Sequence, residues 1–209
     1  MTGEVIPGRM RLSRITITTA RGPGPYRHGR LRQTLFTIAM ALVVLPGPFL
    51  CQADAAELET RYATVHYDND QQLRKFNNEL FLSRNLTFRL REKNIVTFQD
   101  EIAAKIDLLI DQVQVVLEMF PDKIKFDLLL FDNADEAQKE LFHRYGKKVD
   151  FISFYSRRDN TLYLSAKDAE LKVVAHELGH VVLEHYFKNS PPVKIHELLA
   201  QYAASHIAD

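Results

Sequence analysis

Hydrophobic residues recur at three- and four-residue spacing in several segments, which predicts amphipathic helices. The longest such run extends over residues 102–120 and stops at Pro121, and Thr97 with Asp100 just before it matches a capping box. Further helices are predicted over residues 73–80, 134–145 and 169–187. Gly146 follows the second of these directly, and glycine commonly ends a helix.

Runs of β-branched and aromatic residues predict strands. These runs cover residues 62–67, 124–131, 150–156 and 161–165, and a polar four-residue turn joins the last two as in a hairpin. Within residues 83–94, Leu86, Phe88 and Leu90 alternate with polar residues, which indicates one more strand. The sequence therefore predicts an α+β fold in which a small mixed sheet packs on helices.

The helix predicted over residues 169–187 contains His176-Glu177-Leu178-Gly179-His180, the HExxH pattern. Residues four apart lie on one face of a helix, so His176 and His180 can present both imidazoles to one metal ion. Glu177 lies about 100° around the helix from His176, near enough to take a proton from a metal-bound water. The pattern predicts a Zn²⁺ site with Glu177 as the general base.

The flanks of this motif are apolar, so the helix should be largely buried. Buried imidazoles without a partner such as a metal would be costly. Gly179 lowers helix stability by about 1 kcal/mol relative to alanine, and a close approach of another backbone would explain its presence. The alternative is that both histidines have no metal role in a helix that merely packs the core.

Glu197 is the preferred third metal ligand. The helix carries the chain about 12 Å beyond His180, residues 189–192 reverse it, and a second helix returns about 9 Å, which brings Glu197 level with the histidines. We expect Ser190 to cap this second helix and Pro191 to take its first position. The alternative is that Glu197 is an exposed helix carboxylate.

Three neighbouring side chains are less well placed to be the third ligand. His185 lies about 140° around the helix from His180 and should point elsewhere. Glu184 is on the right face but a full turn, about 5 Å, farther along, which suits a supporting or solvated role. His196 points about 100° away from Glu197, so we expect it at the surface or behind a ligand.

Residues 174–181 and 197–202 together resemble the peptidase MA-like gluzincin metallopeptidases, in which aHExxHv is followed by an EGLAxY-like segment. The resemblance implies a zincin-like fold, a Zn²⁺ cofactor held by His176, His180 and Glu197, and a peptide or protein substrate. In this sequence a leucine follows the third ligand where the family commonly has glycine.

Gluzincins often use a further Tyr or His to stabilise the oxyanion, and Tyr155, Tyr202 and His206 all remain open for this role. We expect zinc-dependent peptide hydrolysis in which Glu177 passes the proton of the attacking water to the leaving amine. The hairpin strand beside the motif helix either binds an extended substrate as an added strand or is a plain edge. The alternatives are a zinc-binding but catalytically inactive envelope scaffold or binding protein, and a metal-free α/β domain.

The first 55 residues differ from the rest of the chain. A basic stretch precedes an apolar run over residues 35–45, which is short for a membrane span and typical of a secretory signal peptide, with cleavage expected after Ala55. Lipidation at Cys51 is the alternative, although a leucine precedes it where a small residue is usual. We therefore expect residues 56–209 to be one exported domain, periplasmic or secreted, without a stable membrane span.

The charges are unevenly distributed along the chain. Of 27 basic and 27 acidic residues, seven arginines and two acids lie in residues 1–55, which leaves 20 basic and 25 acidic residues and a net charge of −5. No basic patch with interleaved aromatic residues remains, so nucleic acid is not an expected partner. Cys51 is the sole cysteine of the sequence, so the expected domain must be stabilised by its core rather than by disulfides.

Overall fold

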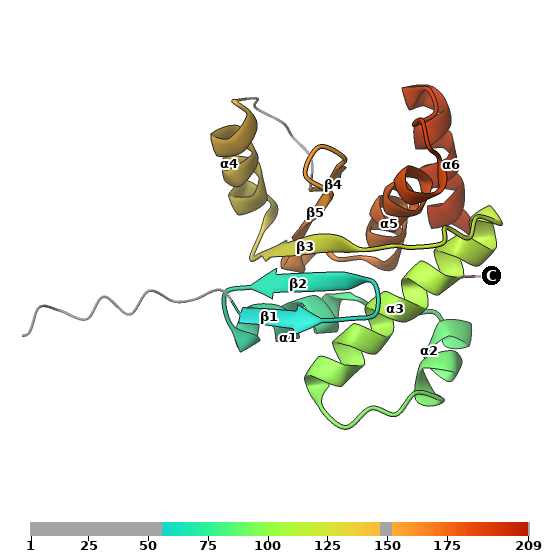
Figure 1. Ribbon diagram of the computed structural model, residues 1–209. Coiled ribbons are helices and arrows are strands. Elements are labelled where there is room, and N and C mark those ends of the chain that lie inside the picture. The colour runs from blue at the N-terminus through green and yellow to red at the C-terminus, as the bar shows by residue number, and fades with distance from the viewer. Residues whose placement is uncertain (1–55, 147–151, 209) are drawn as a thin grey trace, which may run out of the picture. The chain divides into compact units, whose positions relative to one another are not determined.

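The computed structural model describes residues 56–146 and 152–208 (Figure 1). In chain order these form β1 (Ala56–Glu59), β2 (Ala63–Tyr67), α1 (Asp70–Glu79), α2 (Arg84–Arg91), α3 (Phe98–Leu117), β3 (Phe126–Phe131), α4 (Ala134–Tyr145), β4 (Ser153–Ser156), β5 (Thr161–Ser165), a short 3-10 turn (Ala166–Asp168), α5 (Leu171–Tyr186) and α6 (Val193–His206). No helix in these ranges is long and apolar enough to cross a membrane. The expected signal peptide, with Cys51 and cleavage after Ala55, lies outside the described residues.

The strands form one mixed sheet in the order β1-β2-β3-β5-β4. β2, β3 and β5 are parallel, whereas β1 and β4 run antiparallel along the two edges. Val65 pairs with Leu128 and Leu128 pairs with Leu162, so apolar side chains line up across the three central strands. The predicted mixed α+β architecture is confirmed.

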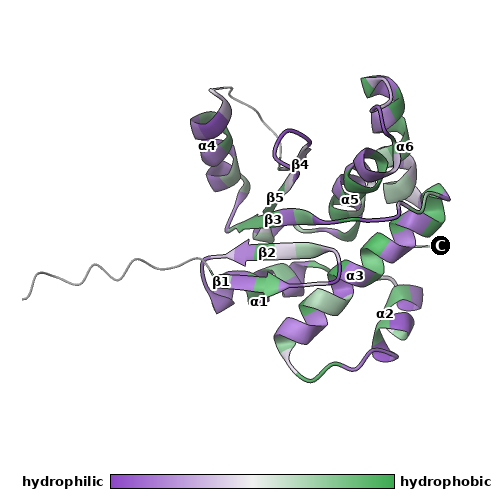
Figure 2. Cartoon of the chain, in the orientation of Figure 1, coloured by the Kyte–Doolittle hydropathy of each residue, from purple (hydrophilic) through white to green (hydrophobic). Residues whose placement is uncertain are grey.

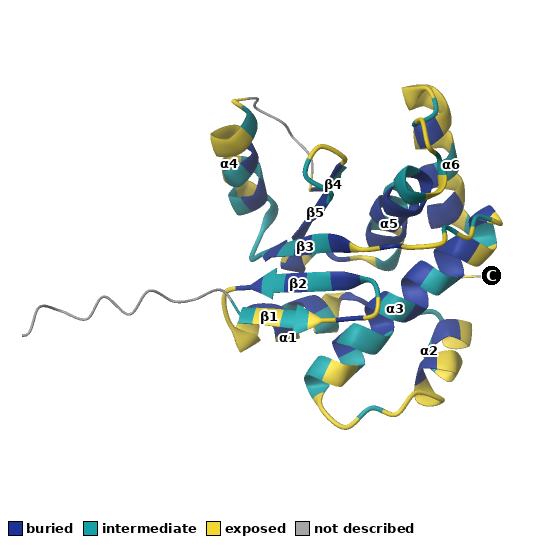
Figure 3. Ribbon diagram, viewed as in Figure 1, coloured by how far each residue is buried: buried dark blue, intermediate teal, exposed yellow. Residues whose placement is uncertain are grey.

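The apolar core lies between one face of this sheet and the helices α1, α3 and α5, whose buried residues are dark blue in Figure 3. At the start of α3, the Thr97 hydroxyl accepts from the Asp100 N–H at 3.1 Å, and the Asp100 carboxylate accepts from the Thr97 N–H at 2.9 Å. This capping box confirms the predicted start of the longest core helix.

Helix α4 packs on β3 and β5 apart from this core, and its mostly hydrophilic surface is purple in Figure 2. Tyr163 of β5 stacks on Phe154 of β4 with ring centroids 4.6 Å apart. The hydroxyls of Tyr145 and Tyr163 both donate to the Asp159 carboxylate at 2.7 Å. These contacts fix the β4–β5 hairpin, which carries one wall of the site described below.

The prediction of a strand within residues 83–94 was wrong, because this segment contains α2. The Ser83 hydroxyl accepts from the Leu86 N–H at the start of the helix. Leu86 and Leu90 are buried on one side of α2, whereas Phe88 is 66% exposed. Strand β1 was not predicted at all.

Candidate metal centre

Helices α5 and α6 approach each other closely at Gly179. A β-carbon at this position would lie 3.0 Å from the Cα atom of Ala200, which is tighter than nearly all β-carbon contacts in packed proteins. The expected close backbone approach at Gly179 is therefore confirmed. Because His176 and His180 flank Gly179 on α5, and Glu197 lies three residues before Ala200 on α6, this crossing brings their side chains together.

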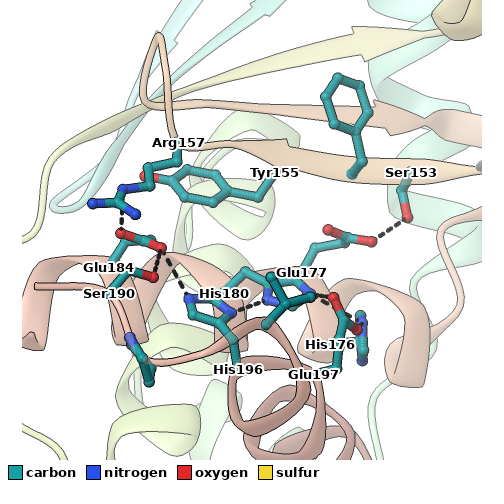
Figure 4. A pocket seen from close by; sticks show the side chains of 13 residues that line it. Ser153, Tyr155, Arg157, His176, Glu177, His180, Glu184, Ser190, His196 and Glu197 are labelled. Carbon is teal, nitrogen blue, oxygen red and sulfur yellow. Dashed lines mark hydrogen bonds and ion pairs between the residues drawn. The ribbon is translucent and has the colours of Figure 1, made fainter. Parts of the chain in front are cut away.

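The side chains of His176, His180 and Glu197 form a compact cluster of metal-binding atoms (Figure 4). The two imidazole Nε2 atoms lie 3.1 Å apart, and the Glu197 oxygens lie 3.5 Å and 3.6 Å from them. A tetrahedral zinc ion with bonds of about 2.0–2.1 Å holds its ligand atoms about 3.3 Å apart. The donor types fit such an ion, and one ligand atom from each residue lies within 4.8 Å of the other two, so small side-chain shifts bring all three to this spacing.

His180 is held in the uncharged form that a metal ligand requires. Burial, together with charge repulsion from the nearby His176 and His196, lowers the pKa of His180 to about 3. A neutral imidazole keeps a lone pair for the metal at neutral pH, so no proton has to be displaced from His180 when an ion binds.

Glu177 is buried and is oriented by strand β4. The Ser153 hydroxyl donates to Glu177 Oε1 at 3.1 Å (Figure 4), and the backbone N–H of Tyr155 donates to the same carboxylate. Burial raises the pKa of Glu177, the two hydrogen bonds lower it and the charge of Glu197 raises it, and the net result is a pKa of about 7. A carboxylate poised near neutral pH is suited to accept and release a proton.

His196 and Glu184 lie behind His180 and away from the ligand cluster. His196 is buried, and its Nδ1 is 2.7 Å from Nδ1 of His180. The Glu184 side chain is only 11% exposed, and its Oε1 lies 3.0 Å from His196 Nε2. Both residues therefore support the site from behind, one of the two roles that the sequence left open for each of them.

The predicted cap of α6 was wrong. Pro192 precedes the first helical residue, Val193, and no side chain caps this end. The Ser190 hydroxyl instead donates to Glu184 Oε1 at 2.6 Å, so its hydrogen bond is used inside the site. Glu197 nevertheless reaches the histidines, because the crossing at Gly179 rather than the cap sets the position of α6.

His185 points away from the cluster, as its angle around the helix predicted. Its Nδ1 lies 2.8 Å from the Val181 carbonyl oxygen, and its Nε2 lies 3.1 Å from the Lys125 carbonyl oxygen. His185 thus ties α5 to the segment before β3 and is not placed to bind the same ion.

Two cavities open on either side of the cluster. One of about 430 Å³ extends from His176 toward Arg157 and Val193, and the other, of about 470 Å³, extends toward Lys172 and Gln201. Three residues line both cavities, namely Ser153, His176 and Glu177. The two cavities therefore meet at His176 and Glu177, and the first is also lined by His180 and Glu197.

Of the three candidates for stabilising an oxyanion, Tyr155 alone lines either of these two cavities. Its hydroxyl donates to Asn160 Oδ1 at 2.7 Å. Tyr202 and His206 instead stack on each other with ring centroids 4.1 Å apart. Tyr155 is thus the best placed of the three, provided that its hydroxyl turns away from Asn160.

Comparison with known proteins adds no relative. No protein-family model matches the chain, and neither the curated proteins nor the solved structures contain a significant match. The functional assignment therefore rests on the side chains of the site and on the motif resemblance.

Proposed function

We propose that this chain is an exported zinc-dependent peptidase with a zincin-like, gluzincin-type site. The observation that carries the proposal is the cluster of His176 Nε2, His180 Nε2 and a Glu197 carboxylate oxygen, which all lie within 4.8 Å of one another. The leader-like composition of residues 1–55 supports an extracytoplasmic location.

The chemistry follows from the neighbours of this cluster. A bound zinc ion would polarise the carbonyl of the scissile peptide bond and lower the pKa of a bound water. Glu177 takes the proton of that water and hands it to the leaving amine, a role favoured by its burial and by its pKa of about 7. Ser153 and the backbone of Tyr155 keep the carboxylate turned toward the site.

Strand β4 is the candidate binding element for the substrate. Within the described residues it pairs with β5 on one side, and no strand pairs with its other edge, where the Tyr155 N–H donates to Glu177. Ser153, Phe154 and Tyr155 of β4 line the first cavity. An extended peptide can pair with such an edge as an added strand, which would lay it across Glu177 and the histidines.

The test is cleavage of a peptide library by zinc-loaded protein and by the Glu177→Gln variant. Glu177→Gln should bind zinc like the wild type and lose at least about 100-fold in turnover, since a general base supplies about 10²–10⁴-fold. Glu170→Gln, at the exposed start of α5, is the matched control and should cleave normally. Equal cleavage by Glu177→Gln and wild type would show that the mechanism is wrong.

One observation favours a second candidate, a zinc-binding scaffold without catalysis. Tyr155 is the one oxyanion candidate that lines either cavity described above, and its hydroxyl is engaged by Asn160. The same experiment separates the two functions. Stoichiometric zinc with no hydrolysis of any library peptide would support the scaffold and exclude the peptidase.

A further inference from the structure

The imidazoles of His180 and His196 meet edge to edge. Their Nδ1 atoms are 2.7 Å apart, their ring planes differ by 16°, and their centroids are 4.8 Å apart. If the rings were stacked face to face, an Nδ1–Nδ1 distance of 2.7 Å would bring their centroids much closer together than 4.8 Å. The two rings therefore lie in nearly one plane. The contact has the length of a strong hydrogen bond.

Such a contact contains one proton, because two N–H groups or two lone pairs would repel each other at 2.7 Å. His180 Nε2 faces His176 and Glu197, so in a metal site it must carry the lone pair. The proton of His180 is then on Nδ1 and is donated to His196. This assignment leaves the proton of His196 on its own Nε2.

The Nε2 of His196 faces a carboxylate that other groups hold in place. Glu184 Oε1 lies 3.0 Å from it as an ion-pair partner, although the approach is too bent to count as a hydrogen bond. Glu184 also pairs with Arg157 Nε at 2.9 Å and accepts from Ser190 at 2.6 Å (Figure 4). Glu184 thus anchors His196 to the β4–β5 turn and to the loop before α6.

We propose that His196, held by Glu184, is a positioning residue that fixes His180 in the tautomer with its proton on Nδ1 and its Nε2 lone pair directed at the metal. The inference rests on the proposed metal site and extends it to a chain of groups from His180 to Arg157. Partners of this kind behind a metal ligand typically contribute 10–100-fold in metal affinity.

The test measures the zinc dissociation constant by competition with a chromophoric chelator. His196→Leu removes the acceptor and should weaken zinc binding by about 10–100-fold. His196→Asn offers a side-chain oxygen to the His180 N–H and should recover most of the lost affinity. His185→Leu is the matched control, because it removes another histidine of the same region without touching the cluster, and it should bind zinc like the wild type.

The outcomes separate this inference from the proposed function. If wild-type protein binds no zinc, the metal site itself is wrong. If the wild type binds zinc and a folded His196→Leu variant binds it equally well, only the role of His196 is overturned. Side-chain ¹⁵N NMR of the zinc-loaded wild type is a second readout that needs no variant: a proton on His196 Nε2 supports the inference, and a proton on His196 Nδ1 overturns it.

Discussion

Gly179 of α5 and Ala200 of α6 are packed so closely that a β-carbon on Gly179 would lie 3.0 Å from the Cα atom of Ala200. Gly179→Ala should therefore push the two helices apart and separate Glu197 from the histidines. Overpacking costs about 1–3 kcal/mol, while alanine restores about 1 kcal/mol of helix propensity, so we expect a net loss of about 1 kcal/mol in unfolding free energy.

Chemical denaturation and chelator competition check this prediction together. Zinc affinity should fall at least about tenfold, because a metal ligand that loses its supporting contacts typically costs at least this much in affinity. A Gly179→Ala variant that is as stable as the wild type and binds zinc as tightly would contradict it.

Ser153 should matter for turnover and not for metal binding. Ser153→Ala removes the hydroxyl that donates to Glu177 at 3.1 Å and leaves the hydrogen bond from the Tyr155 N–H in place. We expect kcat to fall about tenfold, which is a part of the 10²–10⁴-fold rate acceleration that a general base supplies. The zinc content should stay unchanged. Steady-state kinetics and metal analysis measure both quantities, and Ser156→Ala in the same strand should leave kcat unchanged.

Asp159 should make the stability of the protein depend on pH. Burial alone would raise the pKa of Asp159, but hydrogen bonds from Ser156, Tyr145 and Tyr163 outweigh it and hold this pKa below its usual value. Because the pKa is lower in the folded protein than in the unfolded chain, the carboxylate stabilises the fold above about pH 3.9, and this stabilisation is lost as the pH falls through the folded pKa.

Asp159→Asn should accordingly reduce the unfolding free energy by about 1 kcal/mol at neutral pH, the usual contribution of a hydrogen bond. The difference from the wild type should shrink as the pH falls below about 3.9. Thermal unfolding across this range measures it, with the exposed Asp122→Asn as control. A difference that stays constant or grows in acid would rule out this role of the carboxylate.

The error in residues 83–94 shows where pattern reading from the sequence fails. Leu86 and Leu90 are four residues apart, which places them on one face of either a strand or a helix. Phe88 distinguishes the two, because in a strand it would share their buried face. In the helix it lies about 200° around from Leu86 and is exposed. The sequence could not reveal this, since phenylalanine is expected to be buried.

In the candidate site, too, one part could be predicted from the sequence and another part could not. The pairing of His176 with His180 follows from the spacing within one helix, and the return of Glu197 follows from the length of two helices and a turn. The contacts of Ser153 and His196 could not be predicted from the sequence, because they depend on how β4 and α6 pack against α5. Gly179 was the one sequence signal of that packing, as an unfavourable residue inside a buried helix.

X-ray absorption spectroscopy at the zinc edge of the loaded wild-type protein tests the central claim most directly. We expect one bound zinc with two imidazole nitrogens at about 2.0–2.1 Å and oxygen ligands completing the shell, one of them from Glu197. In Glu197→Ala the two imidazoles should remain, with weaker binding. Three imidazoles around the zinc of the wild type would mean that His196 binds in place of Glu197. That result, or the absence of bound zinc, would show that the proposed metal site is wrong.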